Sequence, residues 1–311
     1  MNTYTLSLID ALAKNDIERA KTYAKILLKS DKTDKNRKFC ESRLSMLEKT
    51  DEDIYEELPY NIKSMLIYEN VQERFDVDRY YLAKEEQELF KSIKRACEVS
   101  SRMKEDKVNF LNSTLLWGVS GTGKTTFAKY VAYMLQKPFF YLKFSMLIDS
   151  LMGNTSKNIH LVMDFIRKTD CVFMMDEIDT ISLKRSSASG GSDNEMSRIT
   201  VTIMQEMDDL FYGDNNVILI GATNRKDRMD EALLRRFSID HEVKILRKEE
   251  RLLMAGKFFQ SLNRPLPLEV STFCEEEHSQ AEINVFMVET LAKIYEQELG
   301  EEQNAKAIHM I

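Results

Sequence analysis

The stretch with the clearest capacity for chemistry fits the pattern G-x4-G-K-[ST] and stands between an apolar run and an amphipathic helical pattern. Its glycines would let backbone N–H groups surround phosphate oxygens at the N-terminus of a helix. The lysine could then reach the outer phosphates. A chance match is the alternative, which the setting between strand and helix disfavours. The predicted phosphate-binding residues are Gly118, Val119, Ser120, Gly121, Thr122, Gly123, Lys124, Thr125 and Thr126.

Two neighbouring carboxylates, Asp176 and Glu177, follow an apolar run from Cys171 to Met175. Because the carboxyl ends of parallel strands meet at one edge of a sheet, both side chains are expected beside the phosphate loop. Asp176 and the Thr125 hydroxyl would hold Mg²⁺, and Glu177 would polarise an attacking water. Acidic surface residues at a strand end are the alternative, and the phosphate loop earlier in the chain favours the functional interpretation.

Asn224 and a pair of arginines are further candidates. Asn224 follows the apolar run from Val217 to Ile220, and its amide could hydrogen-bond the water or the γ-phosphate. Taken alone, such an asparagine is usually a turn residue. Arg235 and Arg236 end a short amphipathic pattern, where arginines normally meet solvent or the helix dipole. Phosphoryl transfer, however, commonly uses an outside cation to stabilise the developing charge, which favours a catalytic role.

The elements that must position these side chains are short apolar runs that alternate with amphipathic helical patterns. Strands alternating with helices predict an α/β fold, in which a mostly parallel sheet of five strands has helices on both faces. This places the phosphate loop, the carboxylates and Asn224 at one edge of the sheet. The predicted strands are Thr114 to Trp117, Phe139 to Phe144, Cys171 to Met175, Val217 to Ile220 and Glu242 to Ile245.

The chain divides into four predicted segments. Residues 1–50 show three helical patterns, the last through Cys40, Leu44 and Leu47, and predict a small helical bundle. The acidic stretch that begins near residue 51 predicts a linker over residues 51–79. Residues 80–247 hold the alternating strands and helices, and residues 248–311 show helical patterns alone.

Composition narrows the class of protein. The chain has 311 residues, 43% of them hydrophobic, which suffices for a buried core. Its formal net charge of -7 argues against a surface that binds nucleic acid mainly by neutralising phosphates. The four cysteines show no metal-ligand spacing, which favours a reducing compartment. Because the start of the chain lacks the features of a signal peptide and no apolar run could span a membrane, we expect a cytoplasmic protein without membrane contact.

Together these motifs resemble the AAA+ ATPases, and in particular the AAA clade with its second region of homology. The likeness rests on Asp176-Glu177-Ile178-Asp179, on Ala222-Thr223-Asn224-Arg225 and on the stretch from Asp230 to Phe237. It implies ATP hydrolysis with Mg²⁺, an αβα sandwich with a C-terminal helical lid, and a hexameric ring. It also implies that Asn224 is sensor 1 and that Arg235 and Arg236 are arginine fingers for the next subunit's nucleotide.

Several segments bear on the type of AAA+ protein. Leu151-Met152-Gly153 stands where the clade usually has an aromatic residue that grips a threaded polypeptide, and Asp208-Asp209-Leu210 replaces the common Asp-Gly-Phe. The Ser- and Gly-rich stretch from Ser186 to Ser192 is either a second pore loop or a linker. Ser279 and Glu282 form a capping-box pattern at the start of the expected lid helix, near Ala281.

The resemblance leaves three classes of function open. The leading hypothesis is a homo-oligomer that remodels a protein client or adaptor recruited by the N-terminal helices. An ATP-gated switch or scaffold that activates a partner enzyme is the second hypothesis, and the leucine at position 151 favours it. A DNA-handling loader is third, because the sequence lacks a basic patch and a zinc site.

Overall fold

The computed structural model describes residues 3–14, 17–30, 40, 44, 60–63, 65–144, 155–180, 191–213 and 215–308. The chain forms two compact units, Met1–Leu58 and Pro59–Ile311. In the first unit, helices α1 (Thr3–Ala13) and α2 (Ile17–Ser30) pack against each other. Of the third predicted helix, only Cys40 and Leu44 are described, and both are helical. Leu47 and most of that helix lie outside the described residues.

The second unit is built on a six-stranded sheet with the order β1-β3-β4-β5-β2-β6. Strand β1 is antiparallel to β3, and the other strands pair in parallel. The fold class is therefore confirmed, but the predicted number of five strands was wrong. The strands are β1 (Leu66–Glu69), β2 (Asn112–Trp117), β3 (Phe139–Lys143), β4 (Val172–Asp176), β5 (Ile218–Thr223) and β6 (Ile239–Glu242).

Two strands differ from the sequence prediction for identifiable reasons. β1 lies within residues 51–79, the segment predicted to be a linker, and is followed there by helix α6 (Val71–Arg74). It has only four residues, and its pairing with β3 rather than a local pattern makes it a strand. β6 is Ile239–Glu242 rather than Glu242 to Ile245, because Asp240 and His241 interrupt the apolar pattern although both pair with β2.

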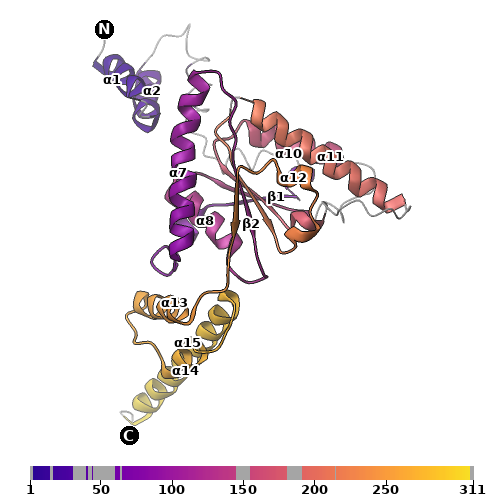
Figure 1. The fold of residues 1–311 in the computed structure, drawn as a ribbon. Helices are drawn as coiled ribbons and strands as arrows, with labels where there is room; N and C mark the ends of the chain where they lie inside the picture. Colours follow the sequence, from indigo (N-terminus) through magenta and orange to yellow (C-terminus); the bar gives the residue numbers. More distant parts are fainter. Residues whose placement is uncertain are drawn as a thin grey trace. The chain divides into compact units, whose positions relative to one another are not determined.

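Helices cover both faces of the sheet, as predicted (Figure 1). Side chains of α7 (Lys84–Glu105) and α8 (Lys124–Met134) share one core with alternate residues of the strands, such as Val172 and Met174 in β4. The intervening residues, Phe173 and Met175, point to the other face and are fully buried. There α10 (Thr155–Arg167) packs against α11 (Gly191–Tyr212).

Short elements complete this part of the second unit: one precedes β1, one follows β4, and two lie between β5 and β6. They are the helices α5 (Tyr60–Lys63) and α12 (Glu231–Leu234), and the 3₁₀ helices η1 (Ile178–Thr180) and η2 (Lys226–Arg228). Within the described part of the chain, no helix has both the length and the apolar character needed to cross a membrane.

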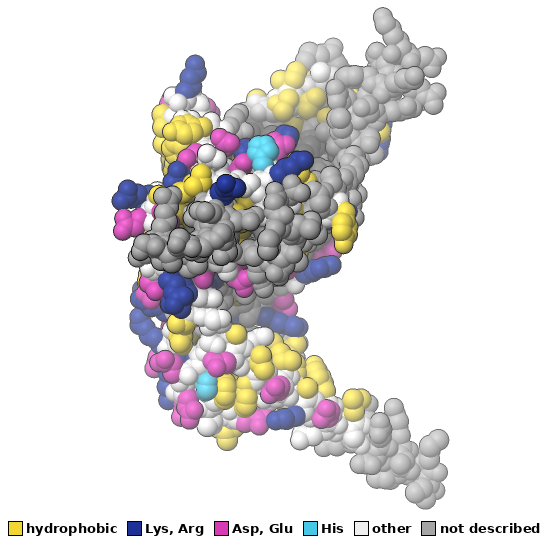
Figure 2. Space-filling model, turned by 90° about the vertical axis from the view of Figure 1, so that its right-hand side faces the viewer, with side chains coloured by type: hydrophobic (Ala, Val, Ile, Leu, Met, Phe, Trp, Pro, Cys, Tyr) yellow, Lys and Arg dark blue, Asp and Glu magenta, His cyan; other side chains and the backbone are white. Residues whose placement is uncertain are grey.

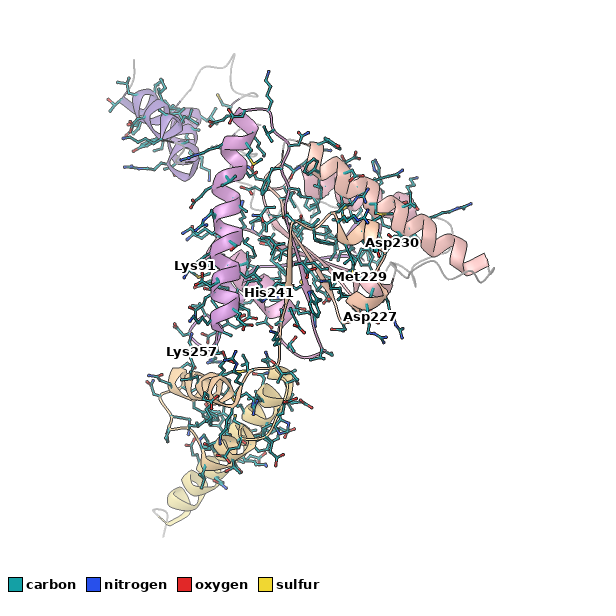
Figure 3. All side chains as sticks on the ribbon, in the orientation of Figure 1. Lys91, Asp227, Met229, Asp230, His241 and Lys257 are labelled. Atoms are coloured by element: carbon teal, nitrogen blue, oxygen red, sulfur yellow. The ribbon has the colours of Figure 1, made fainter. Side chains whose placement is uncertain are left out.

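The C-terminal part of the second unit is helical, as predicted. Helices α13 (Lys248–Ser261), α14 (Leu268–Phe273) and α15 (Gln280–Ile308) enclose a separate core that includes Phe259, Val270 and Ile283. Figure 2 shows hydrophobic side chains interspersed with charged ones on their surface. Lys257, labelled in Figure 3, donates hydrogen bonds from α13 to the carbonyl oxygens of Val77 and Tyr80, which precede α7. These bonds tie the C-terminal helices to the sheet-containing part.

Candidate active site

The predicted phosphate loop connects β2 directly to α8. Its first residue, Gly118, has a φ of 145°, and a Cβ atom there would lie 2.3 Å from the carbonyl oxygen of Val243. Val243 in turn donates its backbone N–H to the carbonyl oxygen of Trp117. A side chain at position 118 would therefore push the loop away from the chain that follows β6. Glycine is required here by both backbone conformation and space.

Lys124 is the first residue of α8, and its side chain folds back over the loop. Its ammonium donates to the carbonyl oxygens of Gly118 and Val119, both at 2.9 Å. The residue is only 7% exposed. Burial lowers the pKa of Lys124, whereas the carboxylates of Asp176 and Asp179 act in the opposite direction. The positive charge is thus held inside the loop, at a helix N-terminus that also favours an anion.

The Asp176 carboxylate, at the end of β4, accepts three hydrogen bonds. Oδ2 accepts from the Thr125 hydroxyl at 3.2 Å and from the Tyr141 hydroxyl at 3.0 Å. Oδ1 accepts from the backbone N–H of Glu177 at 2.8 Å. Burial, the charge of Asp176 and the hydrogen bond to it raise the pKa of Tyr141, which stays a neutral donor. The predicted pair Thr125 and Asp176 is therefore adjacent, and Tyr141 is a member that sequence analysis missed.

Glu177 adopts a left-handed backbone conformation with a φ of 53°. For a residue other than glycine, such a conformation costs about 1–3 kcal/mol and often occurs at functional sites. The turn into η1 stabilises it, because the Glu177 carbonyl oxygen accepts from the backbone N–H of Thr180 at 2.9 Å and from its hydroxyl at 2.8 Å. Both Glu177 and Asp176 line the same pocket.

Asn224 directly follows β5 and is exposed. The preceding Thr223 fixes the turn, since its hydroxyl donates to Asp179 at 2.7 Å and accepts from the backbone N–H of Arg225 at 2.9 Å. Asn224 lines the same pocket of about 760 Å³ as Asp176 and Glu177. The phosphate-loop residues from Ser120 to Thr126 line it as well. The structure thus brings together candidates from three separate parts of the sequence.

The family is decided by comparison with known proteins. Residues 114–245, which run from β2 to just beyond β6, match the family described as ATPase family associated with various cellular activities (AAA). The chain contains an AAA ATPase domain. The resemblance to the AAA+ ATPases is therefore confirmed, and the matched region contains the phosphate loop, both carboxylates, Asn224 and both arginines.

Curated relatives share the AAA domain over part of their length. A putative 26S proteasome regulatory subunit homolog of Methanothermobacter thermautotrophicus is 31% identical over 204 residues, which cover 64% of this chain and 54% of the relative. A proteasome-activating nucleotidase of Methanococcus maripaludis is 36% identical, over 44% of this chain and 33% of the relative. The peroxisomal ATPase PEX6 of Kluyveromyces lactis is 38% identical, over 39% of this chain and 12% of the relative. The matched region thus spans about half or less of each relative.

Two other segments of the unit that carries the AAA domain complete the pocket, and of these sequence analysis identified only the start of the lid helix, near Ala281. One is the chain just before α7, from Phe75 to Ala83, which begins inside the predicted linker of residues 51–79 and contributes aromatic and charged side chains. The other is formed by α13 and the start of α15, where Ala281 donates its backbone N–H to the carbonyl oxygen of Gly121 at 2.9 Å. The capping box is confirmed, because Glu282 accepts from the backbone N–H of Ser279 and Ser279 from that of Glu282. These wall residues include Phe75, Tyr80, Met254, Phe258, Asn284 and Met287.

Arg235 and Arg236, at the end of α12, do not line the pocket of their own AAA domain. The Arg235 side chain is 79% exposed and, among the described residues, forms an ion pair with the Glu231 carboxylate alone, at 3.4 Å. Arg236 instead binds Asp208 of α11 through two hydrogen bonds, and these bonds raise the pKa of its guanidinium. The two neighbouring arginines are therefore in different environments.

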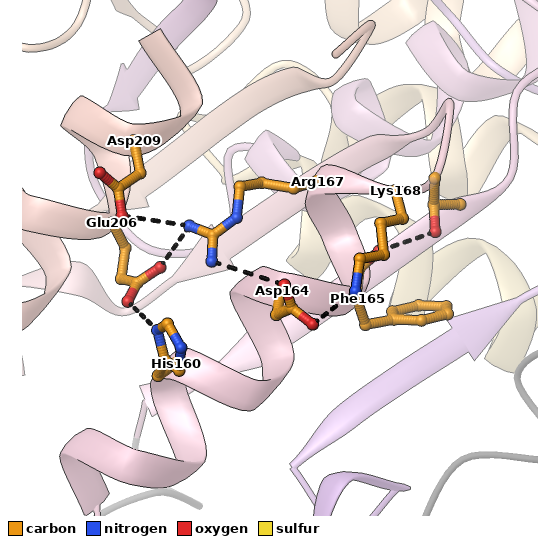
Figure 4. A network of polar contacts seen from close by, with 8 residues as sticks. His160, Asp164, Phe165, Arg167, Lys168, Glu206 and Asp209 are labelled. Carbon is orange, nitrogen blue, oxygen red and sulfur yellow. Dashed lines mark hydrogen bonds and ion pairs between the residues drawn. The ribbon is translucent and has the colours of Figure 1, made fainter. Parts of the chain in front are cut away.

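A network of ion pairs joins α10 to α11, the helix that carries Asp208 (Figure 4). At its centre is Glu206, whose side chain is 6% exposed. It accepts from Arg167 at 2.7 Å and lies 2.8 Å from Nδ1 of His160. Asp209 approaches Arg167 at 3.5 Å. Asp208 and Asp209 therefore both form ion pairs within this chain, and Asp209 stands where the common family pattern has glycine.

The two predicted pore loops lie outside the described residues. The first is Leu151-Met152-Gly153. The second is the Ser- and Gly-rich stretch from Ser186 to Ser192, of which residues 186–190 lie outside the described part.

Proposed function

We propose that this AAA domain hydrolyses ATP with Mg²⁺ at the pocket described above, and that a second copy of the chain completes the site. The observation that carries the proposal is the separation of the candidate residues. Lys124, Asp176 and Glu177 line one pocket, whereas the exposed guanidinium of Arg235 lies outside it. A cation that cannot serve its own pocket is available to a neighbouring one.

The phosphate loop binds the phosphates of ATP. Backbone N–H groups of residues from Ser120 to Thr126 face phosphate oxygens at the N-terminus of α8. The ammonium of Lys124 is now held by two carbonyl oxygens, and it exchanges these weak neutral acceptors for charged phosphate oxygens. Gly118 and Val119 do not line the pocket; their carbonyl oxygens accept the hydrogen bonds from Lys124.

The side chains beside the loop fit a divalent cation with a preference for oxygen. A hydroxyl and a carboxylate stand 3.2 Å apart at Thr125 and Asp176, and Mg²⁺ usually combines one or two carboxylates with substrate phosphates and waters. When bound there, Mg²⁺ would neutralise charge on the β- and γ-phosphates. Thr125 would contact the ion and Asp176 would hold one of its water molecules.

We assign the attacking water to Glu177 and Asn224, which both line the pocket. The turn at Glu177 directs a carboxylate toward the pocket, where it can accept a proton from water. The amide of Asn224 can donate to the γ-phosphate and accept from the same water. Among the predicted site residues, Lys124 is then the only cation that lines the pocket. We therefore assign to Arg235 of the next copy the stabilisation of the negative charge that develops on the transferred phosphoryl group.

Mixing two inactive proteins tests the shared site. Lys124→Ala should lose ATP binding, and Arg235→Ala should bind ATP but not turn it over. In a mixed oligomer, an intact pocket from the second protein can meet an intact arginine from the first. We expect partial recovery of ATPase activity that rises with protein concentration. Co-assembly without any recovery would overturn the shared site, and normal ATP affinity in Lys124→Ala would overturn the phosphate loop.

We further propose that the oligomer, a hexameric ring, acts on a protein client. The support is the names of two relatives, one a proteasome-activating nucleotidase and one a peroxisomal ATPase. The N-terminal unit offers a surface for recruitment, because Leu6, Ile9 and Leu12 recur every three residues on α1 and are each about half exposed. Capture with a Glu177→Gln protein loaded with ATP tests this. An unfolded protein supports remodelling, a folded enzyme supports the ATP-gated switch, and nucleic acid contradicts both.

A further inference from the structure

We infer that Tyr141 is a positioning residue for the metal site. Its hydroxyl holds the Asp176 carboxylate in the orientation that binds the water shell of a divalent cation. The inference rests on the proposed function, because it assigns a role toward the metal that ATP hydrolysis requires. It concerns a side chain of β3 that belongs to neither the phosphate loop nor the strand of the acidic pair.

The sheet geometry brings Tyr141 to Asp176. Lys143 of β3 is the direct partner of Asp176 in β4, and Tyr141 is the partner of Met174. Tyr141 is therefore two residues before the residue opposite Asp176, a diagonal that a long aromatic side chain can span. Its hydroxyl reaches Oδ2 of Asp176 at 3.0 Å. A serine or asparagine at this position would be too short to do so.

The bonds to Asp176 determine how the carboxylate can be used. An ionised carboxylate offers about four acceptor sites. The hydroxyls of Tyr141 and Thr125 and the backbone N–H of Glu177 occupy three of them. These donors come from β3, α8 and the turn after β4, so they fix the carboxylate from three directions. Only about one acceptor site then remains for a metal-bound water.

The hydroxyl of Tyr141 is separable from the role of its ring in packing. Phenylalanines occupy positions 139 and 140 of the same strand and are fully buried. The ring of Tyr141 packs partly against the core under α8. Tyr141→Phe should therefore keep the strand and the core, and should remove only the hydrogen bond to Asp176. Partners of this kind typically change metal affinity by about 10- to 100-fold when they are removed.

The test compares Tyr141→Phe with the wild type and with Tyr133→Phe. Tyr133 is a partly buried tyrosine of α8 outside the pocket. The affinity for a non-hydrolysable ATP analogue is measured by calorimetry. The first measurement is made with a chelator that removes divalent cations, and the second series is made over a range of Mg²⁺ concentrations. Tyr141→Phe should bind the analogue normally without metal and need about 10-fold more Mg²⁺ for the metal-dependent gain in affinity. Tyr133→Phe should match the wild type in both measurements.

Three other outcomes would contradict either the positioning role of Tyr141 or the proposed function. An unchanged Mg²⁺ requirement in Tyr141→Phe, beside a metal-dependent wild type, overturns the positioning role. An equal loss of affinity with and without metal also overturns it, because the hydroxyl would then support the pocket in general. A wild type whose affinity does not respond to Mg²⁺ contradicts the proposed function itself. Melting temperatures followed by circular dichroism show that all three proteins are folded.

Discussion

Arg236 and Asp208 form a bidentate ion pair between α12 and α11. The guanidinium donates from Nε to Oδ1 at 2.9 Å and from Nη2 to Oδ2 at 2.8 Å. A third donor, Nη1, reaches the carbonyl oxygen of Ala232 at 2.8 Å. A parallel pair of this kind fixes the orientation of both groups. The pair therefore holds the end of α12 against α11. Because Arg235 directly precedes Arg236, the pair also fixes the backbone that carries Arg235.

The two arginines should differ in their effects on turnover. Arg235→Ala should lower the ATPase rate by about 10³-fold or more, the range known for arginine fingers in GTPases, without changing ATP affinity or melting temperature. Arg236→Ala should lower the melting temperature and reduce the rate less, because it loosens the support of Arg235. Steady-state rates and thermal melts of the single variants check this.

Asp208→Asn supplies the matched control for that comparison. It removes the charge partner of Arg236 without touching either arginine. Its effects on the rate and on the melting temperature should resemble those of Arg236→Ala, and the double variant should add little to either. If Arg236→Ala instead stops turnover at an unchanged melting temperature, both arginines act directly on a nucleotide.

Gly118 offers a direct test of the loop geometry, and Gly256 serves as its control. At Gly118 an alanine Cβ would meet a backbone oxygen at 2.3 Å, and backbone atoms cannot move aside easily. Gly118→Ala should lower the free energy of unfolding by about 1–3 kcal/mol. Gly256 lies within α13 with no atom within 4 Å of the added Cβ. Gly256→Ala should raise the free energy of unfolding by about 0.5–1 kcal/mol. Denaturant titrations measure both changes, and a stabilising Gly118→Ala would contradict the structure of the loop.

Glu177 should be needed for hydrolysis but not for binding. Glutamine keeps the size of the side chain and is a far weaker base, so Glu177→Gln should slow hydrolysis by about 10²- to 10⁴-fold at unchanged ATP affinity. Single-turnover rates and calorimetry provide the two measurements. Glu177→Ala is the companion variant, because it keeps the positive φ and removes the polar group. Wild-type turnover in either variant would assign the water to another residue.

The sequence was sufficient where the chemistry is local in the chain. The phosphate loop is one continuous stretch, and the acidic pair and Asn224 each end a strand that is apolar enough to identify. The order of strands and helices then places them at one edge of the sheet, which is where the structure has them. The capping box of Ser279 and Glu282 was predictable for the same reason, because its partners are three residues apart.

The sequence was insufficient where a residue acquires its role through tertiary pairing. Tyr141 has no local signal, because only the register of β3 against β4 brings its hydroxyl to Asp176. β1 is a strand because β3 is its neighbour. The different environments of Arg235 and Arg236 depend on Asp208, which is distant in sequence. In each case the contact that gives the residue its role joins segments that are distant in sequence, and a local periodic pattern cannot predict such a contact.

Lys257 should influence ATP affinity although it does not line the pocket. Its ammonium donates from α13 to the carbonyl oxygens of Val77 at 3.2 Å and Tyr80 at 2.6 Å, in the segment that forms one wall of the pocket. Lys257→Met keeps most of the apolar stem and removes both donors. Hydrogen bonds to a charged group are each worth about 1.5–3 kcal/mol, so the wall should loosen and the KM for ATP should rise about 10-fold at nearly unchanged kcat. Lys293→Met, at an exposed position of α15, is the control and should change neither constant. A Lys257→Met protein that loses kcat at constant KM would instead place the effect on the chemical step, and would contradict a role for these bonds in holding the nucleotide wall.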